Sequence, residues 1–577
     1  MSEIVQRGRA VDASGPLSPT QRLGTGALAA AVVAVCILLL CLPLKLPVGP
    51  MYWDLVVYLD GAQRVLSGQI PSVDFFAPVG PLGYWLFAAG ETLFPRAQPL
   101  LLVQWTFLAI TLPPLLPVLA GVERQSRLRA LALFVPFLVF QLAPMNVEQY
   151  SSFPGVDGYG IYNRQATELL FVLTAALVFE RRQRVMLFVI AWCCIALFLS
   201  KITGFAAGGM LCAFAFLAGR VSLRTALASL AAFGLALVAL DAGTGLVRAY
   251  LGDILLLVSM NEGVLLSRFL QAGSVHFGIF GSGVLLLVAL VAIDRRSIAS
   301  AAGALLRHPS PGRCAALFDR DAAWVAAALF TGLFFETQNT GGQAFIFLWP
   351  ILLAIVVAAP RLATVPMIAV LTLTAATYLP PLVDVVHRTI RAIGGEAKTV
   401  AIPGPHLKSL GAVTQKPEIV ASARNLIANY QRFPEAYQAF ADARQLPSYF
   451  MYSDVEFQVA WLLATEDAVS SILAYEARTG ERFQTIMSLN FVNPYPYLLD
   501  RQAPRRIAIG ADPFRAVPPP DAETLATVAA TDLVLYPTCP VTAANVRLRE
   551  IYAPALTGHR EVRLSPCWIG LLRQPAS

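Results

Sequence analysis

The sequence predicts an α-helical membrane protein that crosses the bilayer many times and carries a small α/β domain near its C-terminal end. Three observations support this fold class. The 577 residues are 56% hydrophobic and only 14% charged, whereas soluble domains carry about 25% charged residues. Apolar segments of roughly 15–22 residues recur over the first two thirds of the chain. Beyond about Gly394 the charge density rises and the apolar runs shorten.

The apolar segments define the expected spans. We expect about eleven membrane helices, and the shorter ones need local thinning of the bilayer or shelter from neighbouring helices. The expected spans are approximately 24–47, 99–121, 128–145, 165–179, 185–200, 202–219, 225–241, 276–293, 322–337, 343–359 and 362–383.

The positions of the arginines predict the orientation of these spans. Arg7, Arg9 and Arg22 precede the first span, and every second loop after it also carries arginine. Because Lys and Arg collect on the cytoplasmic side, we expect residues 1–23 to form a cytoplasmic tail and residues 24–393 a membrane domain. An odd number of spans then places residues 394–577 outside. The formal charge of +7 is therefore interpreted as topology, and no basic run is long enough to predict a nucleic-acid partner.

The last third of the chain predicts the outer α/β domain. Residues 416–433 have the spacing of an amphipathic helix, and 521–530 predicts a helix between strands. Short buried strands are expected at 483–490 and 531–538, and a third single strand at 561–573.

The first outer loop, residues 48–98, is the part of the chain most suggestive of chemistry. It contains the stretch "MYWDLVVYLDGAQRVLSGQIPSVDFFAPVGPLGYWL", which is too polar to cross a bilayer and too apolar for an ordinary surface loop. Two helical pieces, 55–68 and 80–94, predict a platform along the membrane surface over a cavity. Asp54 stands just beyond the first span, where an acid is retained if it is paired, coordinated or used. The alternative is an acid that only caps a helix at the interface.

This loop resembles the first outer loop of GT-C membrane glycosyltransferases, and is closest to the bacterial branch that includes the lipid A aminoarabinose and galacturonic acid transferases. In that branch an acid after the first helix is followed by a Tyr/Ala-rich helix, Gly, Pro, an Asp-Phe pair, Gly-Pro-Leu and aromatics. Leu55 stands where the family usually has a second acid. The matching residues here are Asp54, Tyr58, Ala62, Gly68, Pro71, Asp74, Phe75, Gly80, Pro81, Leu82 and Tyr84.

The resemblance implies a transfer of sugar from a polyprenyl-phosphate donor to an acceptor hydroxyl, at the outer face of a bacterial cytoplasmic membrane. The acceptor would be an envelope lipid or glycan, and membrane lipids would surround the protein. Asp54 is the expected general base. The leaving lipid phosphate needs a cation or a metal, and Arg164 and Lys201 are the candidate phosphate ligands. The alternatives are an ion pair of Arg164 with Glu168 one turn on and snorkelling of Lys201 to the interface.

Further polar residues are candidates for binding substrate. Tyr58 belongs to the matched motif. The turn "FFETQNTGGQ" offers Glu336, Gln338, Asn339 and Gln343 to a sugar, or is an ordinary polar turn. Asp74 could orient the acceptor or bind a divalent metal, or cap a turn. No Cys/His cluster has zinc spacing, a metal requirement stays open, and we expect the lone His276 to be structural.

A non-enzymatic protein, such as an exporter or scaffold for envelope lipid or polysaccharide, is the alternative function. An exporter should carry ionisable residues at mid-helix and broken helices in matched halves. The sequence contains no clear halves, and its spans are almost free of mid-helix charge. A membrane glycosyltransferase is therefore the favoured reading.

The cysteines predict one disulfide. Cys539 follows the strand expected at 531–538 and Cys567 interrupts the strand expected at 561–573. They are the only cysteines of the domain that topology places outside, where thiols are oxidised. The helix expected between them would return the chain beside the first strand, and neighbouring strands lie about 4.8 Å apart. We therefore predict a Cys539–Cys567 bridge, with two buried free thiols as the alternative.

Overall fold

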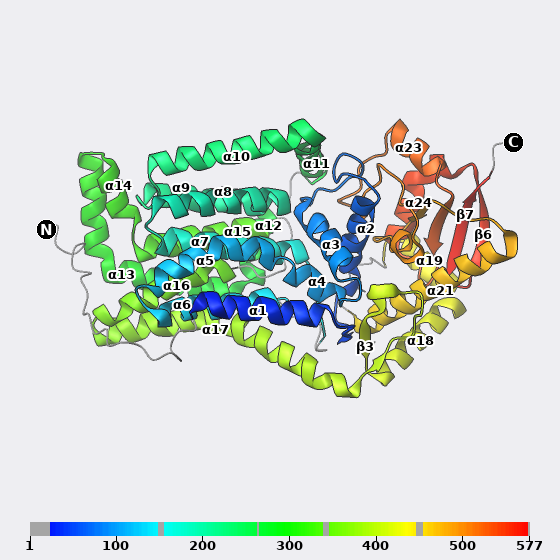
Figure 1. Ribbon diagram of the computed structural model, residues 1–577, viewed down its shortest axis with the longest axis horizontal. Helices are drawn as coiled ribbons and strands as arrows, with labels where there is room; N and C mark the ends of the chain where they lie inside the picture. The colour runs from blue at the N-terminus through cyan, green and yellow to red at the C-terminus, as the bar shows by residue number, and fades with distance from the viewer. Residues whose placement is uncertain (1–23, 148–154, 262–264, 338–344, 446–453, 575–577) are drawn as a thin grey trace.

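The computed structural model describes residues 24–147, 155–261, 265–337, 345–445 and 454–574. A bundle of nearly parallel helices occupies one side of the molecule, and a smaller body of helices and strands caps one end of that bundle (Figure 1). The small body combines the first outer loop with the C-terminal third of the chain. This arrangement brings segments far apart in sequence to one junction.

The bundle contains a helix in each of the eleven segments predicted to span a membrane. Five helical stretches are long and apolar enough to cross a bilayer: Pro99–Glu123, Gln183–Ser200, Leu223–Thr244, Phe277–Arg307 and Thr364–Lys398. How many of the others cross stays a prediction. The bundle helices are α1 (Thr25–Leu40), α4 (Pro99–Trp105), α5 (Leu108–Glu123), α6 (Arg127–Leu142), α7 (Ile161–Phe179), α8 (Gln183–Ser200), α9 (Ile202–Leu217), α10 (Leu223–Thr244), α13 (Phe277–Arg307), α15 (Asp321–Glu336), α16 (Trp349–Ala358) and α17 (Thr364–Gly395).

The helices differ in which surfaces they bury. Almost every residue of α7 from Ile161 to Leu177 is buried, including the polar residues Asn163, Arg164 and Glu168 of its first half, as expected for a helix at the centre of a bundle. By contrast, α10 buries only Thr225 and Ser229, while Leu230 and Leu235 are 66% and 70% exposed. An apolar surface this continuous is the kind that faces lipid or a partner.

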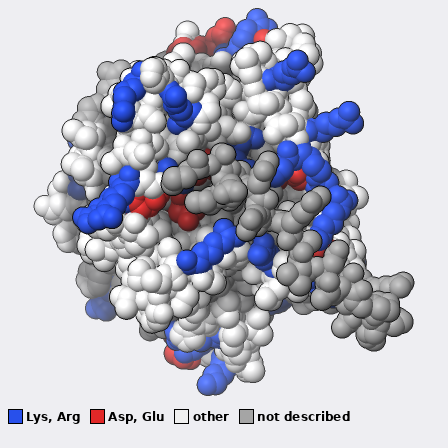
Figure 2. All heavy atoms as spheres, turned by 90° about the vertical axis from the view of Figure 1, so that its left-hand side faces the viewer, with Lys and Arg blue, Asp and Glu red and all other residues white. Residues whose placement is uncertain are grey.

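The arginine-bearing loops gather at the end of the bundle away from the small body. The face at that end shows many Lys and Arg side chains scattered over it (Figure 2). The exposed arginines of the loops predicted to be cytoplasmic include Arg124, Arg127, Arg129, Arg181, Arg224 and Arg307. The arginine-bearing loops that predicted the orientation therefore lie together at one end of the bundle (Figure 1).

Two segments expected as loops are helical. The stretch after 293, predicted to be cytoplasmic, continues α13 to Arg307 and is followed by α14 (Pro311–Phe318), because its "SIASAAGALLR" is rich in strong helix formers. The stretch between α10 and α13, predicted to lie on the other side, holds two amphipathic helices, α11 (Leu246–Met260) and α12 (Leu265–Val275).

The outer loop and the C-terminal third form one hydrophobic core. This core joins Tyr52 and Trp53 of the loop to Phe457 and Trp461 of the C-terminal third. A three-stranded sheet reinforces the junction: β1 (Leu46–Pro47) pairs in parallel with β3 (Val413–Gln415), which pairs antiparallel with β2 (Val400–Ala401). The two predicted loop helices are present as α2 (Leu55–Leu66) and α3 (Leu82–Leu93).

The rest of the C-terminal third surrounds a four-stranded sheet of order β4-β5-β7-β6. The helices expected at 416–433 and 521–530 and the strands expected at 483–490 and 531–538 are present. After β5, α24 and β6 return the chain so that β7 lies beside β5. The elements are α18 (Pro417–Arg432), α19 (Pro434–Asp442), α21 (Val455–Thr479), β4 (Ile486–Ser488), α22 (Tyr495–Leu499), α23 (Ala522–Ala529), β5 (Leu533–Pro537), α24 (Ala543–Leu556), β6 (His559–Ser565) and β7 (Trp568–Arg573).

The prediction of one strand over 561–573 is wrong. The segment is a hairpin, with β6 and β7 antiparallel and Pro566 and Cys567 between them. Proline has no N–H to give to a ladder, so the strand ends there. The 25-residue helix α21 was not predicted. It buries residues such as Phe457, Trp461, Thr465 and Ile472, and because it contacts both the sheet and the outer loop it has no single apolar stripe.

The predicted Cys539–Cys567 disulfide is present, with a Cα–Cα distance of 4.9 Å and a sequence separation of 28 residues. It joins the end of β5 to the β6–β7 turn. Closing a loop of about this length restricts the unfolded chain and is worth roughly 3–4 kcal/mol in the loop-entropy model.

We expect thiol labelling of the denatured, unreduced protein to leave Cys539 and Cys567 unmodified, while the six other cysteines, which are free in the structure, react. A Cys539→Ser variant should lower the unfolding free energy of the outer domain by roughly 3 kcal/mol. Mass spectrometry of the labelled peptides checks the bridge, and labelling of both cysteines without reductant would contradict it.

Candidate functional site

Asp54 lies at the junction between the bundle and the small body. It closes a single 3-10 turn, Tyr52–Asp54, that leads directly into α2. Met51 enters this turn with φ of 56°, in the left-handed region, which a residue other than glycine adopts only when its surroundings hold it there. The Asp54 side chain is half-buried. The turn therefore presents one carboxylate at a fixed point beyond the first helix.

Burial, and after it the neighbouring Asp157, raise the pKa of Asp54, which comes to about 7. The Gly160 backbone N–H, the Arg515 guanidinium and the Trp53 side chain oppose this shift because they favour the ionised form. A carboxylate with a pKa near neutrality can accept a proton readily at physiological pH, as a general base must. The alternative of a simple capping acid does not account for this environment, since the Asp54 side chain makes no cap hydrogen bond to α2.

Asp157 is a second acid of the site and was missed in the sequence. Two strands of backbone bring it to Asp54: Val156 N–H donates to Pro47 O at 2.8 Å and Gly49 N–H donates to Val156 O at 3.1 Å. A Cβ on Gly158 would lie 2.3 Å from the Met51 carbonyl oxygen, so only glycine allows this approach. Burial raises the pKa of Asp157. The glycine-rich segment "GVDGYG" around Asp157 is the sequence feature that could have identified this acid.

Arg164 lies beside Asp157, in the first turn of α7. It is 1% exposed, and its Nη2 donates to the Asp157 carbonyl oxygen at 2.7 Å. Its Nε and Nη1 have no hydrogen-bond partner among the described residues. A buried guanidinium with two N–H groups that donate to no described residue can bind an anion.

The alternative ion pair with Glu168 is not formed. Glu168 accepts a hydrogen bond from Gln104 Nε2 at 2.7 Å instead, and the described ion pairs within 4.0 Å do not include Arg164 with Glu168. The two side chains lie one turn apart on α7 without meeting. Arg164 therefore keeps its charge directed toward the Asp54 end of the bundle.

Lys201 reaches the same end of α7 from the junction between α8 and α9. Its ammonium donates to Asn163 Oδ1 and lies 4.6 Å from the centre of the Phe335 ring and 5.4 Å from that of Tyr162. The side chain is buried, so it does not snorkel to a surface. Because Asn163 and Arg164 are consecutive, both predicted phosphate ligands converge at the amino end of α7.

Tyr58 also belongs to this cluster. Its ring is buried against Tyr84, with 5.6 Å between ring centres, and its hydroxyl has no hydrogen-bond partner among the described residues. Arg164 and Asp54 are among the charges that act on it. A buried phenol next to a guanidinium and a carboxylate is a ready hydrogen-bonding group for a ligand.

Glu336 ends α15 beside Lys201. It is fully buried, and its Oε2 lies 3.3 Å from Nε2 of His276. His276 precedes α13, so this contact joins two bundle helices, which agrees with the structural role expected for the histidine. Gln338, Asn339 and Gln343, which the sequence grouped with Glu336, lie outside the described residues.

Asp74 is placed elsewhere, and its expected role in binding acceptor or metal is replaced by a structural one. Its carboxylate accepts from the Ile70 N–H at 2.7 Å and pairs with Arg505 Nη1 at 2.7 Å. It therefore caps a turn of the outer loop and ties that loop to the C-terminal domain. The turn-cap alternative is what the structure shows.

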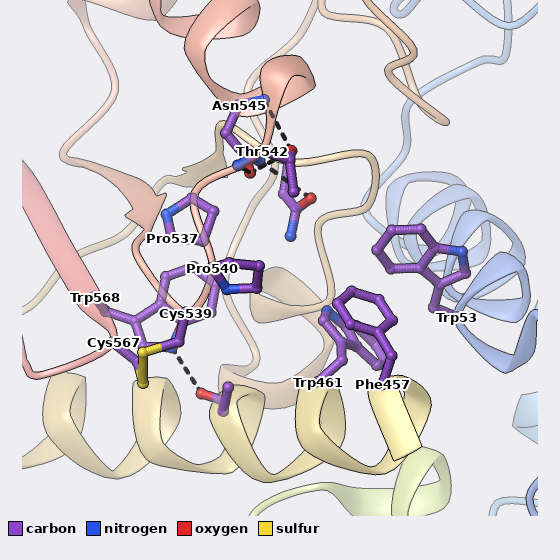
Figure 3. A pocket seen from close by; sticks show the side chains of 12 residues that line it. Trp53, Phe457, Trp461, Pro537, Cys539, Pro540, Thr542, Asn545, Cys567 and Trp568 are labelled. Carbon is purple, nitrogen blue, oxygen red and sulfur yellow. Dashed lines mark hydrogen bonds between the residues drawn. A yellow bond between two sulfur atoms is a disulfide. The ribbon is translucent and has the colours of Figure 1, made fainter. Parts of the chain in front are cut away.

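A hollow in the small body adjoins the site through Trp53. Aromatic rings dominate its lining, and the disulfide forms part of one wall (Figure 3). The Phe457 and Trp461 side chains rise into it from α21 (Figure 3). The described residues contain no group of three or more His, Cys, Asp or Glu side chains arranged to hold a metal ion.

Comparisons with known proteins give a distant likeness. No family model and no curated protein matches the chain. Among solved structures, the chain is similar to ArnT from Cupriavidus metallidurans in the apo state, with a TM-score of 0.40 and 11% identity over 96% of this chain and 99% of that one.

The same enzyme bound to undecaprenyl phosphate gives a TM-score of 0.39 and 13% identity over 96% of this chain and 100% of that one. ArnT is a GT-C lipid A aminoarabinose transferase, the kind of protein that the outer loop resembles in sequence. At these scores the likeness assigns no residue and no activity.

Proposed function

We propose that this chain is a membrane glycosyltransferase of the GT-C type, which moves a sugar from a polyprenyl-phosphate donor to an acceptor hydroxyl. The observation that carries the proposal is that a carboxylate of near-neutral pKa, Asp54, and a buried cation, Arg164, both act electrostatically on Tyr58, with a second buried cation, Lys201, held beside Arg164 through Asn163. A base next to a cationic pocket is what glycosyl transfer from a lipid phosphate needs.

In the proposed reaction the acceptor oxygen attacks the anomeric carbon of the donor sugar. A carbon–oxygen bond forms to the acceptor, and the bond from the sugar to the lipid phosphate breaks, with its electron pair leaving on the phosphate. The acceptor proton passes to the Asp54 carboxylate. The reaction would invert the anomeric centre, because base and leaving group act on opposite faces of the sugar.

Arg164 and Lys201 would hold the phosphate of the donor and stabilise the charge that grows on it as the sugar leaves. Tyr58 interacts electrostatically with Arg164 and Glu336 with Lys201, and both would bind the donor's sugar.

The protein would sit in a bacterial cytoplasmic membrane with its site on the outer face. The gathering of arginines at the opposite end of the bundle (Figure 2) supports this orientation. The rival function of an exporter expects ionisable groups at mid-depth lining a path. Glu168 is such a group, but it is buried and hydrogen-bonded by Gln104, which gives the exporter no support.

Asp54→Asn should lower turnover by about 10²–10⁴-fold while leaving the protein folded, because the amide cannot take the acceptor proton. In the wild type, kcat/KM should fall as the pH drops below about 7, where Asp54 becomes protonated. Turnover of a radiolabelled polyprenyl-phosphate sugar measures both. Asp74→Asn is the matched control, a carboxylate of the same loop outside the cluster, and near-normal turnover in Asp54→Asn would refute the base assignment.

Replacing either buried cation should weaken donor binding more than it changes expression. Arg164→Met and Lys201→Met should each raise the Kd for polyprenyl phosphate by roughly 10–100-fold, the loss expected for a charge-assisted hydrogen bond. Lys408→Met, which removes a lysine that pairs with Asp500 at 2.7 Å in the outer domain, should bind normally. Unchanged affinity in both Arg164→Met and Lys201→Met would exclude the phosphate site.

Reporter fusions test the orientation. An enzyme that is active only outside the cytoplasm should function when fused after Ser577 and be inactive when inserted at Arg307, and a cytoplasm-dependent reporter should show the reverse. Activity of the external reporter at Arg307 would reverse the assignment of faces.

A further inference from the structure

The C-terminal domain grips the turn that carries Asp54. The Tyr52 hydroxyl donates to the Leu410 carbonyl oxygen at 2.9 Å, and the Trp53 backbone N–H donates to Gln458 Oε1 at 3.0 Å. Gln458 belongs to α21 and is 0% exposed. Both residues before Asp54 are therefore hydrogen-bonded to the C-terminal domain, in a turn whose entry residue has an unfavourable backbone conformation.

The Trp53 side chain is held as firmly as its backbone. It is 1% exposed, and its ring meets Phe457 and Trp461 edge-on, with ring centres 5.7 and 6.1 Å away. Phe491 lies 5.4 Å from it on another side. These three aromatics all come from the C-terminal domain, and Figure 3 shows Trp53 facing the pair from α21 across the hollow. Edge-on aromatic contacts fix the orientation of a ring as well as its position.

The position of Trp53 matters because Asp54 follows it directly in the same 3-10 turn, Tyr52–Asp54, so that whatever fixes Trp53 also fixes the backbone that carries the carboxylate. The other groups that act on Asp54 are the Gly160 N–H, Asp157 and Arg515, and the tyrosines Tyr58 and Tyr159 lie within electrostatic reach. Asp157 and Gly160 belong to the loop before α7 and Tyr58 to α2. Trp53 is the residue through which α21 contacts the turn that carries the carboxylate.

We propose that the C-terminal domain is a positioning element for the catalytic turn, in which Gln458 and the aromatic side chains of α21 fix Trp53 and through it orient the Asp54 carboxylate toward the acceptor. Gln458 touches no reacting atom in this scheme. The role of Asp54 as base rests on the proposed function, whereas the coupling of Gln458 to the Asp54 carboxylate can be tested without any transfer reaction.

The test uses the full-length protein in detergent or nanodiscs and three variants. Gln458→Leu removes the acceptor for Trp53 N–H and leaves that donor buried and unsatisfied. Gln458→Glu keeps an oxygen acceptor at the same place. Gln415→Leu is the matched control, because Gln415 is another buried glutamine of the C-terminal domain, whose Nε2 donates to the Val48 carbonyl of the same outer loop at 2.8 Å but away from Trp53.

The first measurement is the pH dependence of carbodiimide modification of Asp54, followed by peptide mass spectrometry. Loosening the turn moves the Asp54 carboxylate away from the Gly160 N–H and the Arg515 guanidinium, which favour its ionised form, so its pKa should rise. In Gln458→Leu we expect the midpoint to move upward by about half to one pH unit, while Gln415→Leu stays at the wild-type value. A lower amount of folded protein would not move this midpoint.

The second measurement separates kcat from KM in the transfer assay. Gln458→Leu should lower kcat by about 10–100-fold through misplacement of the base, with little change in KM for the donor, and the acidic limb of its pH profile should shift upward in step with the labelling midpoint. Gln458→Glu should recover most of kcat.

The inference is overturned if Gln458→Leu leaves both midpoint and kcat unchanged, or if Gln415→Leu shifts them equally, since that would be a general effect of weakened domain contact. If the labelling midpoint moves as expected while Asp54→Asn transfers sugar normally, the coupling stands and it is the proposed function that fails.

Discussion

The gathering of positive charge at the amino end of α7 is the constraint on which the site depends. Arg164 and Lys201 are both buried there, and the free N–H groups of a helix start add further positive potential. Burying two cations in an apolar bundle is unfavourable unless negative groups lie close. The acids Asp157 and Glu336 and the carbonyl and amide oxygens around them supply part of this compensation. The two unpaired donors of Arg164 leave room for an anionic ligand.

Burial and the groups nearest to Asp54 account for its state. A lone carboxylate in this half-buried position would be neutral well above its ordinary pKa, and a second acid, Asp157, makes ionisation harder still. Arg515 and the Gly160 N–H pull in the other direction. The balance leaves a pKa of about 7, so small changes in geometry decide whether the group is a base at neutral pH. This sensitivity gives a physical reason for bracing the turn from several sides.

The bracing comes from two segments remote in sequence. The loop before α7 lies against residues 47–51 through backbone hydrogen bonds and a contact that only Gly158 permits. On the other side, α21 binds Trp53 through Gln458 and a set of aromatic rings. The outer loop is therefore part of the same folded body as the C-terminal third. The domain boundary predicted near residue 394 divides the chain in sequence, but in space the loop of residues 48–98 belongs with residues 394–577.

The sequence by itself determined the positions of the bundle helices, the side of the bundle that carries the arginines, the outer-loop helices α2 and α3 and the pairing of Cys539 with Cys567. These features depend on local composition, on periodicity, or on there being one way to pair two cysteines. Asp54, Arg164 and Lys201 were identifiable for a similar reason, because an ionisable residue beside an apolar span stands out.

Only the tertiary structure decided which polar residues meet. Asp157 reaches Asp54 through a backbone approach between segments about a hundred residues apart, and Arg164 turns to the Asp157 carbonyl rather than to Glu168. Asp74, which matched a motif as well as Asp54 did, pairs with Arg505 instead. The helix α21 and the β6–β7 hairpin were likewise missed or misread. In each case the outcome depends on which surfaces become buried against each other, and a pattern of neighbours along one chain carries no information about that.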